Sequence, residues 1–336
     1  MKYLLFDFSN LAHRTFHVVT EKDKDSRRQM IMSGIAFSIF DIYERISPDK
    51  CVFVFDSNSW RKKIFEQYKA NRQDAYANDL EGQEIIYNVI ADYYEFIDEK
   101  TDAFALKYPD AECDDLISLF IQEHPEDEIV IASTDTDFYQ LISNKVSLYS
   151  PVSKNLIKID KVINSENEEV PFTLDGNGKI KIGKTDGIPL SEIEGYGTWA
   201  EWCLYCKIIR GDSSDNVFSA YPGVRVKGNK NKVGILESFK GRKTKDFNYV
   251  NFVNQTWENL DGEQVLVEDK IEFNKRLIDL NHIDDEYKVR FQKYIKDYES
   301  NFILKQQVGI KLGQFAVKNY LTNVSDNLYA YIPIFK

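Results

Sequence analysis

Three short apolar runs in the first half of the chain each end at acidic residues. The runs cover residues 3–6, 51–55 and 129–132, and the acids that follow them are Asp7, Asp56, Asp135 and Asp137. Continuous apolar runs of this length are typical of strands that are buried on both faces. Helix-like segments, such as residues 33–46, lie between the runs. The sequence therefore predicts an α/β fold with a mostly parallel central sheet flanked by helices.

Composition excludes several other classes of protein. The chain has 336 residues, of which 43% are hydrophobic and 29% charged, the balance of a globular protein. No apolar run approaches the ~20 residues of a membrane span, and Asp7 interrupts the only candidate signal-peptide core. Four cysteines are too few to form a disulfide framework in a chain of this length. We therefore expect a reduced, cytoplasmic protein with no membrane segment.

The pattern of elements and charge divides the chain into three parts. We expect an α/β core over residues 1–158 with a helix-rich segment over about 61–100, a hairpin insertion over 159–197, and a helical region over 198–336 with a helix–turn–helix at about 200–240. The hairpin signal is Asp175-Gly176-Asn177-Gly178, which lies between two short alternating segments.

The acids at the strand ends are expected to converge, because the carboxyl ends of parallel strands form the crevice where ligands bind. Further acids lie beside predicted helix ends: Glu112, Asp114, Asp115, Asp212 and Asp215. So many like charges in one cleft would repel one another unless cations neutralised them. Oxygen ligands without His or Cys favour Mg²⁺ or Mn²⁺. Two such ions would suit hydrolysis of a phosphodiester bond.

Basic residues are concentrated in two stretches, although the net charge of -11 argues against a protein that coats nucleic acid indiscriminately. In residues 60–73, the spacing of Arg61, Lys69 and Arg72 predicts one basic helical face above the acidic edge, able to hold a phosphate. Residues 225–245 carry eight basic side chains against one acid. The glycines at the start of this second stretch would expose backbone amides to a duplex phosphate.

Taken in order, these motifs resemble the structure-specific 5′ nucleases, a family of flap endonucleases, 5′ nuclease domains of bacterial DNA polymerase I and phage 5′ exonucleases. The likeness is closest to the RNase H enzymes of T-even bacteriophages and implies a PIN-like 5′ nuclease core with a helical arch. The motifs are Phe6-Asp7-Phe8-Ser9-Asn10, Phe55-Asp56, Tyr68-Lys69-Ala70-Asn71-Arg72, Glu112-Cys113-Asp114-Asp115, Ser133-Thr134-Asp135-Thr136-Asp137-Phe138 and Gly211-Asp212-Ser213-Ser214-Asp215-Asn216.

The resemblance implies a role for each group of site residues. The first metal site would comprise Asp56, Glu112, Asp114, Asp135 and Asp137, with Asp7 nearby through water; the second would comprise Asp137, Asp212 and Asp215, with Asp115 in the outer shell. Lys69 and Arg72 would contact the scissile phosphate, and Tyr68 would stack on a base. The duplex would be held by Gly223, Arg225, Lys227, Gly228, Lys230 and Lys232. Val226 occupies a position where the family usually has a glycine.

By the same resemblance, the expected activity is that of a two-metal 5′ nuclease with RNase H activity. Its substrates would be 5′ flaps and nicks in duplex DNA and RNA–DNA hybrids, and its role the removal of RNA primers during phage DNA replication. We expect a monomer, with a single-strand binding protein or a sliding clamp as candidate partners.

Several other functions fit parts of this sequence but leave other parts unexplained. A DNA-binding scaffold of the same fold would be expected to lack several of the acids. A PIN-type ribonuclease would share the acidic cleft but is usually shorter and lacks the basic helix–turn–helix. A glycosyltransferase could use Asp135-Thr136-Asp137, but Asp7 and the acids near residue 212 would then be unexplained, and a phosphatase needs the pair after its first strand. Cys203 and Cys206 could be half of a zinc site, but we expect them to be buried helix residues.

Overall fold

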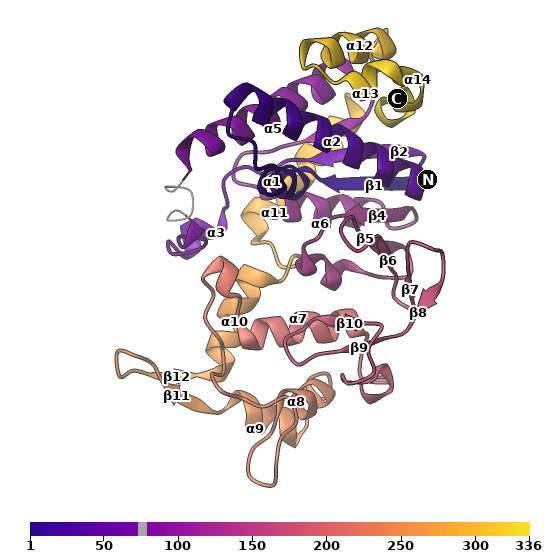
Figure 1. The fold of residues 1–336 in the computed structure, drawn as a ribbon. Coiled ribbons are helices and arrows are strands. Elements are labelled where there is room, and N and C mark those ends of the chain that lie inside the picture. The colour runs from indigo at the N-terminus through magenta and orange to yellow at the C-terminus, as the bar shows by residue number, and fades with distance from the viewer. Residues whose placement is uncertain (73–78) are drawn as a thin grey trace.

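A central sheet of eight strands organises the computed structural model, which describes residues 1–72 and 79–336 (Figure 1). In chain order the strands are β1 (Lys2–Asp7), β2 (Lys50–Val54), β3 (Phe104–Leu106), β4 (Glu128–Ala132), β5 (Val146–Ser150), β6 (Asn155–Ile157), β7 (Val162–Ile163) and β8 (Glu169–Val170). Their spatial order is β3-β2-β1-β4-β5-β6-β7-β8, with β1 to β5 parallel and the last three antiparallel. The predicted fold class is confirmed.

Strand β1 shows why the apolar runs are continuous. Leu4 and Phe6 are buried in a cluster with helices α1 (Phe8–Val18), α2 (Lys24–Ile46) and α5 (Leu80–Lys100). Tyr3 and Leu5 belong to a second buried cluster, on the opposite face of the sheet. Because alternate side chains of a strand point to opposite faces, both faces need apolar residues.

The second face of the sheet is covered by α6 (Cys113–Glu123), and helices from the later part of the chain extend its core. These helices are α7 (Trp199–Arg210), α8 (Ile235–Gly241), α9 (Phe247–Val253), α10 (Val267–Ile278) and α11 (Asp285–Ser300). A small hairpin of β11 (Thr256–Glu258) and β12 (Gln264–Leu266) leads into α10. Short 3-10 helices are η1 (Thr136–Leu141), η2 (Leu190–Glu192) and η3 (Ser213–Asp215). Among the described residues, no helix is long and apolar enough to cross a membrane.

The segment predicted as an insertion over 159–197 contains the expected hairpin, formed by β9 (Phe172–Leu174) and β10 (Ile180–Ile182). Its beginning is not separate from the core, however, because β7 and β8 extend the central sheet. The predicted boundary at residue 158 therefore falls within the sheet. Burial of Phe172 and Leu174 also joins β9 to the main core.

The end of the chain returns to the first face of the sheet, as Figure 1 shows beside α5. This segment comprises α12 (Val308–Lys318), α13 (Thr322–Asp326), α14 (Leu328–Tyr331) and η4 (Ile332–Phe335). The ring of Phe335 lies 5.9 Å from that of Phe53 and 5.4 Å from that of Phe96, between centroids. Residues 198–336 are therefore not one unit, because their last part completes the core of the N-terminal sheet.

The helical arch predicted over residues 61–100 is only partly described. Helix α3 (Arg61–Ile64) is a single turn, and α5 packs against α1 and α2. The part of the arch at residues 73–78 lies outside the described residues.

Candidate metal centre

Six of the nine acids predicted as ligands lie close together at the edge where β1 and β4 end. They form three groups in which the potential ligand atoms are within 4.8 Å of one another: Asp7, Cys113 and Asp114; Asp114, Asp135 and Asp137; and Asp137, Asp212 and Asp215. Because Asp114 and Asp137 are shared between groups, the carboxylates form a continuous row. Asp56, Glu112 and Asp115 are outside these groups.

Asp7 begins the row, at the junction of β1 and α1. Its Oδ1 accepts a hydrogen bond from the Asn10 amide at 3.0 Å, and its Oδ2 accepts one from the Ser133 hydroxyl at 2.8 Å. Burial, assisted by the charge of Asp56, raises the pKa of Asp7 to about 7. The two hydrogen bonds fix the Asp7 side chain in place. A cation bound beside it would lower this raised pKa and favour the charged carboxylate.

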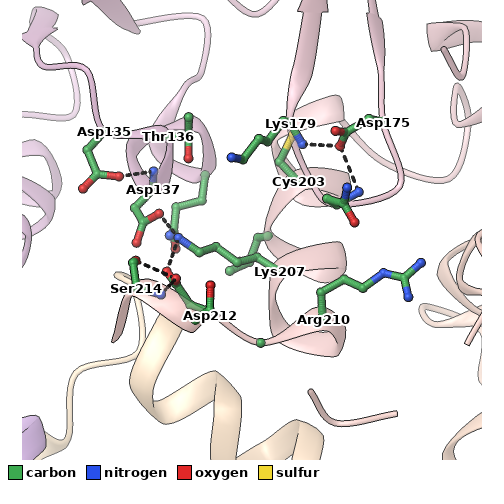
Figure 2. A pocket seen from close by; sticks show the side chains of 16 residues that line it. Asp135, Thr136, Asp137, Asp175, Lys179, Cys203, Lys207, Arg210, Asp212 and Ser214 are labelled. Carbon is green, nitrogen blue, oxygen red and sulfur yellow. Dashed lines mark hydrogen bonds and ion pairs between the residues drawn. The ribbon is translucent and has the colours of Figure 1, made fainter. Parts of the chain in front are cut away.

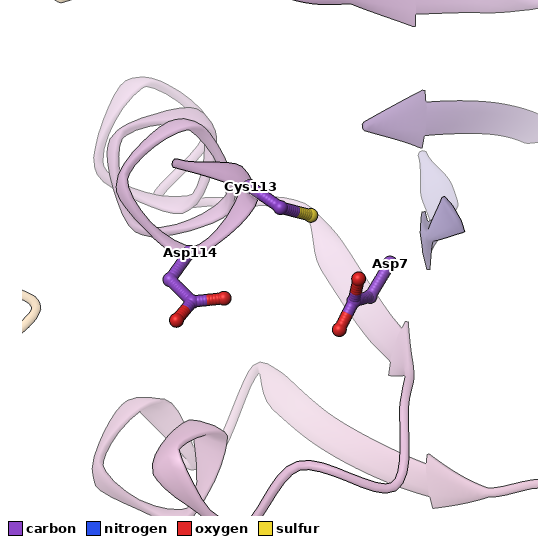
Figure 3. A group of neighbouring side chains, drawn as sticks. All are labelled: Asp7, Cys113 and Asp114. Carbon is purple, nitrogen blue, oxygen red and sulfur yellow. The ribbon is translucent and has the colours of Figure 1, made fainter. Parts of the chain in front are cut away.

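Cys113 and Asp114 face Asp7 from the first turn of α6 (Figure 3). Burial raises the pKa of the Cys113 thiol, which donates a hydrogen bond to the Val54 carbonyl at 3.5 Å. A neutral thiol is a poor ligand for hard cations. In this group, the carboxylates of Asp7 and Asp114 are therefore suitable ligands for a hard cation, and the Cys113 thiol is not.

Asp135 and Asp137 are held by the turn that follows β4. Oδ1 of Asp135 accepts a hydrogen bond from the Asp137 amide at 2.8 Å, and the Asp135 amide donates to the Ser133 hydroxyl at 3.0 Å. This arrangement caps η1, so one short turn presents both carboxylates. Burial raises the pKa of Asp135, although Lys207 and Lys69 oppose that shift.

Lys207 is a site residue that the sequence analysis missed. From α7, its ammonium forms ion pairs with Asp137 and with Asp212, the latter at 2.8 Å (Figure 2). Although burial acts in the opposite direction, Lys207 lowers the pKa of Asp212. The available signal was its place in the last turn of a helix that ends at Arg210, two residues before Asp212.

The shared helical face predicted for Arg61, Lys69 and Arg72 is wrong. Helix α3 ends at Ile64, and Lys69 has a positive φ of 57°, which no helix residue adopts. The prediction that Arg61 binds DNA is also wrong, because its side chain is 1% exposed. Arg61 forms ion pairs with Glu112 at 3.0 Å and Asp115 at 2.9 Å, so it is a buried structural cation.

Asp115 and Tyr68 are occupied by contacts inside the protein. Asp115 is fully buried, where its carboxylate accepts hydrogen bonds from the indole of Trp60 and the amide of Glu112, each at 3.1 Å. The Tyr68 hydroxyl donates to Asp215 at 3.0 Å, and the side chain is buried. Tyr68 therefore holds Asp215 in place, and its buried ring contradicts the prediction that it stacks on a base.

Glu112 has a carboxylate surrounded by donors rather than by other acids. It accepts hydrogen bonds from Ser59 at 2.7 Å and Arg61 at 3.0 Å, and it forms an ion pair with Lys69. Burial alone would raise its pKa, but Lys69 and Arg61 lower the pKa of Glu112 to about 2. The carboxylate therefore favours its charged form and fixes the Lys69 ammonium.

Lys69 and Arg72 lie beside the acids. Together with Asp7, Asp56, Asp114 and Asp135, they line a cavity of about 480 Å³. The Lys69 ammonium is 3.8 Å from Asp215, and Arg72 forms an ion pair with Asp215 at 2.6 Å. Asp56 is exposed at this cavity and accepts a hydrogen bond from the Cys113 amide at 2.8 Å. A phosphate in the cavity would meet both basic side chains and the acids.

The predicted duplex-binding residues lie in the connection between α7 and α8. Arg225, Lys227, Lys230 and Lys232 are exposed there. Gly228 needs to be a glycine, because a Cβ at this position would lie 2.4 Å from the Lys232 carbonyl oxygen. Gly223 has a positive φ of 71° and is exposed. These residues form a compact, basic surface loop.

The sequence is similar to one family model and to bacterial DNA polymerases and flap endonucleases. A family model for the 5'-3' exonuclease N-terminal resolvase-like domain matches residues 2–168. DNA polymerase I of Caldicellulosiruptor bescii is 25% identical over 285 residues, which cover 82% of this chain and 27% of the polymerase. Flap endonuclease Xni of Psychromonas ingrahamii is 27% identical over 152 residues, 44% of this chain and 55% of that protein. The chain thus matches about a quarter of the polymerase and about half of the flap endonuclease.

Solved structures show the same fold. A flap endonuclease of bacteriophage T5, in a complex with DNA and metal ions, aligns with a TM-score of 0.57 at 16% identity, covering 90% of this chain and all of that one. A T5 protein co-crystallised with metal ions aligns with a TM-score of 0.56 at 17% identity, covering 88% of this chain and 99% of that one. These structures show the fold alone. The family model over residues 2–168 and the sequence relatives, with the ordered motifs, show that the chain belongs to the family of 5′ nucleases that includes the 5′–3′ exonucleases and flap endonucleases.

Proposed function

We propose that this protein is a divalent-metal-dependent nuclease that hydrolyses phosphodiester bonds at 5′ ends and flaps of duplex nucleic acid. The observation that carries the proposal is the continuous row of carboxylates from Asp7 to Asp215, with basic side chains beside it. A scaffold that only binds DNA has no need to keep so many like charges together, since their repulsion is unfavourable.

The donor set fits hard cations. Asp114, Asp135 and Asp137 would hold one ion, and Asp137, Asp212 and Asp215 a second, with Asp7 and Asp56 close to the first. Mg²⁺ or Mn²⁺ bound there would supply an activated water and neutralise charge on the leaving oxygen. Glu112 and Asp115 act differently in this proposal, because their carboxylates are already paired with Lys69 and Arg61.

The side chains of the protein supply positioning and charge. Lys69, fixed by Glu112, presents its ammonium where negative charge on the reacting phosphate would increase in the transition state. Arg72 orients Asp215 and lines the same cavity. Four exposed basic side chains would bind duplex phosphates away from the reacting bond: Arg225, Lys227, Lys230 and Lys232.

We further propose a role in DNA replication, in which RNA primers are removed from RNA–DNA hybrids. The likeness to DNA polymerase I supports the link to DNA replication. The RNA–DNA hybrid is the substrate that the family resemblance of the motifs implies. We propose that the protein acts as a monomer in the cytoplasm, that of the host if it is encoded by a phage. A single-strand binding protein or a sliding clamp would be its partner at the replication fork.

The test uses end-labelled nicked, 5′-flapped and RNA–DNA hybrid duplexes. Short products derived from 5′ ends should appear with Mg²⁺ or Mn²⁺ and disappear with chelator. Asp135→Asn should abolish cleavage and leave binding of the flapped duplex largely intact, because basic side chains, among them those of the exposed loop at residues 225–232, would supply most of the binding. Cleavage in the presence of chelator would refute metal dependence, and equal attack on 3′ ends would refute the proposed polarity.

A further inference from the structure

We propose that the β9–β10 hairpin is part of the nucleic-acid site, and that Lys179 in its turn binds a backbone phosphate of the cleaved strand next to the reacting one. This inference rests on the proposed function, because it takes the row of acids as the place of cleavage. It gives the insertion a role in substrate positioning.

The turn of the hairpin is fixed firmly against α7. Gly178 is buried with a φ of +80°, and a Cβ there would lie 2.4 Å from the Cys203 carbonyl oxygen. The indole of Trp202 donates a hydrogen bond to the Asp175 carbonyl at 3.1 Å. Oδ1 of Asp175 accepts hydrogen bonds from the amides of Asn177 and Lys179, each at 2.8 Å. The position of Lys179 is therefore set by the same helix that carries Lys207.

The turn and the acids line one cavity of about 590 Å³ (Figure 2). Asp135, Asp137 and Asp212 line one side, and Asp175, Lys179 and Arg210 line the other. The volume falls within the range of ~300–1,000 Å³ that is typical of sites for small organic ligands. The cavity thus has room for more than the reacting phosphate, and a strand held at the acids would extend toward the turn.

The hairpin side of the cavity carries two basic side chains, Lys179 and Arg210, against one carboxylate, Asp175. Lys179 is exposed, and its ammonium has no ion pair or hydrogen bond with any described residue; Figure 2 shows the side chain extending toward the acids. Among the described residues, Arg210 donates to two neutral carbonyls, those of Gly176 at 3.2 Å and Val224 at 2.7 Å. Lys207, by contrast, is neutralised by Asp137 and Asp212. The two basic side chains exceed the one carboxylate, and this net positive charge opposite a metal-binding edge suits a second phosphate of the same strand.

The hairpin also contacts the basic loop. A Cβ added to Gly176 would lie 2.0 Å from a methyl group of Val226, so the two residues pack closely. Arg210 bridges the hairpin and the loop through the same two carbonyls. Val226, which replaces the glycine usual in related loops, therefore forms part of the hairpin's support. Through this contact the turn and the duplex-binding loop are held in one arrangement.

The experiment measures binding of a 5′-flapped duplex in Ca²⁺, with a neutral methylphosphonate placed at each position around the cleavage site in turn. Lys179→Ala should raise the Kd about three- to tenfold and reduce the slope of log K against log salt by about 0.7–0.9. One methylphosphonate should weaken binding of the unmodified protein but have no further effect on Lys179→Ala. Lys179→Arg should restore sensitivity at that position.

Lys184→Ala is the matched control, because Lys184 is exposed two residues after β10 but does not line the cavity. If Lys179→Ala behaves like Lys184→Ala, or if its effect adds to that of every methylphosphonate, the inference is wrong. Failure of the proposed function looks different: no cleavage would occur with Mg²⁺ on any 5′ end, whereas the position-specific loss in Ca²⁺ would still support a phosphate contact at Lys179.

Discussion

The Lys207 ammonium lies 2.8 Å from Oδ2 of Asp212 and also contacts the carboxylate of Asp137. Both carboxylates belong to the group that we propose for the second ion. A cation of the protein itself therefore compensates part of the charge at this end of the row. This arrangement holds the acids together without metal, and an incoming ion has to compete with Lys207.

Replacing this lysine should make the fold depend on metal. In Lys207→Ala, Asp137 and Asp212 lose their shared counter-ion, so the free energy of unfolding in chelator should fall by about 2 kcal/mol. Mg²⁺ should raise the Tm of the variant by more than that of the unmodified protein, because the ion no longer displaces an ammonium. Thermal unfolding with and without Mg²⁺ measures both effects, with Lys179→Ala as control. If Mg²⁺ raises the Tm of Lys207→Ala and of the unmodified protein by the same amount, this interpretation is contradicted.

Lys69 should affect the rate of cleavage more than binding. Its ammonium faces the row of acids from the cavity, where a reacting phosphate would lie. Lys69→Ala should reduce the single-turnover rate at saturating substrate by about 10²-fold or more, with little change in Kd. Lys63→Ala is the control, since Lys63 is exposed and paired with Asp110. A normal saturated rate with weakened binding would show that Lys69 only docks the substrate.

The exposed loop should behave in the opposite way. Lys230→Ala combined with Lys232→Ala should weaken binding of all duplex sequences alike and flatten the salt dependence by roughly one to two units. The rate at saturating DNA should remain unchanged, because these contacts are similar in the ground and transition states. Binding isotherms at several salt concentrations test this directly. A sequence-dependent loss, or a slower saturated rate, would place these lysines nearer to the reacting bond.

Arg61 should be important for folding rather than for DNA. Arg61→Ala leaves Glu112 and Asp115 buried without one of their main partners, so it should reduce the free energy of unfolding by about 3–5 kcal/mol. Urea unfolding at neutral pH measures the loss. If the variant unfolds at the same urea concentration as the unmodified protein but binds DNA more weakly, the structural role of Arg61 is refuted.

Local sequence patterns predicted the central strands and the convergence of six acids. Run length identifies a buried strand, and the residue after such a strand lies at the carboxyl edge, which accounts for Asp7, Asp135 and Asp137. The other three acids, Asp114, Asp212 and Asp215, were expected there from the order of the motifs. The hairpin at Asp175 was equally local, because its turn residues specify it.

The same local rules could not predict contacts between segments that are distant in the sequence. Arg61 and Tyr68 look like surface residues in the sequence, and only the position of α6 shows that Glu112 and Asp115 require them as buried partners. Lys207 meets Asp137 because α7 packs against η1, a contact that periodicity does not encode. Lys69 adopts a left-handed backbone conformation that a helical reading of residues 61–72 does not include.

The packing of Phe335 against Phe53 has a consequence for the synthesis of the protein. The two residues are separated by 282 positions, so at ~5–20 residues per second the ribosome needs roughly 15–55 seconds to supply the second after the first. During that interval, one face of the nascent sheet lacks part of its apolar cover and offers a surface to chaperones. A fragment limited to residues 2–168 would keep that part of the face permanently uncovered, and we expect it to aggregate when produced alone.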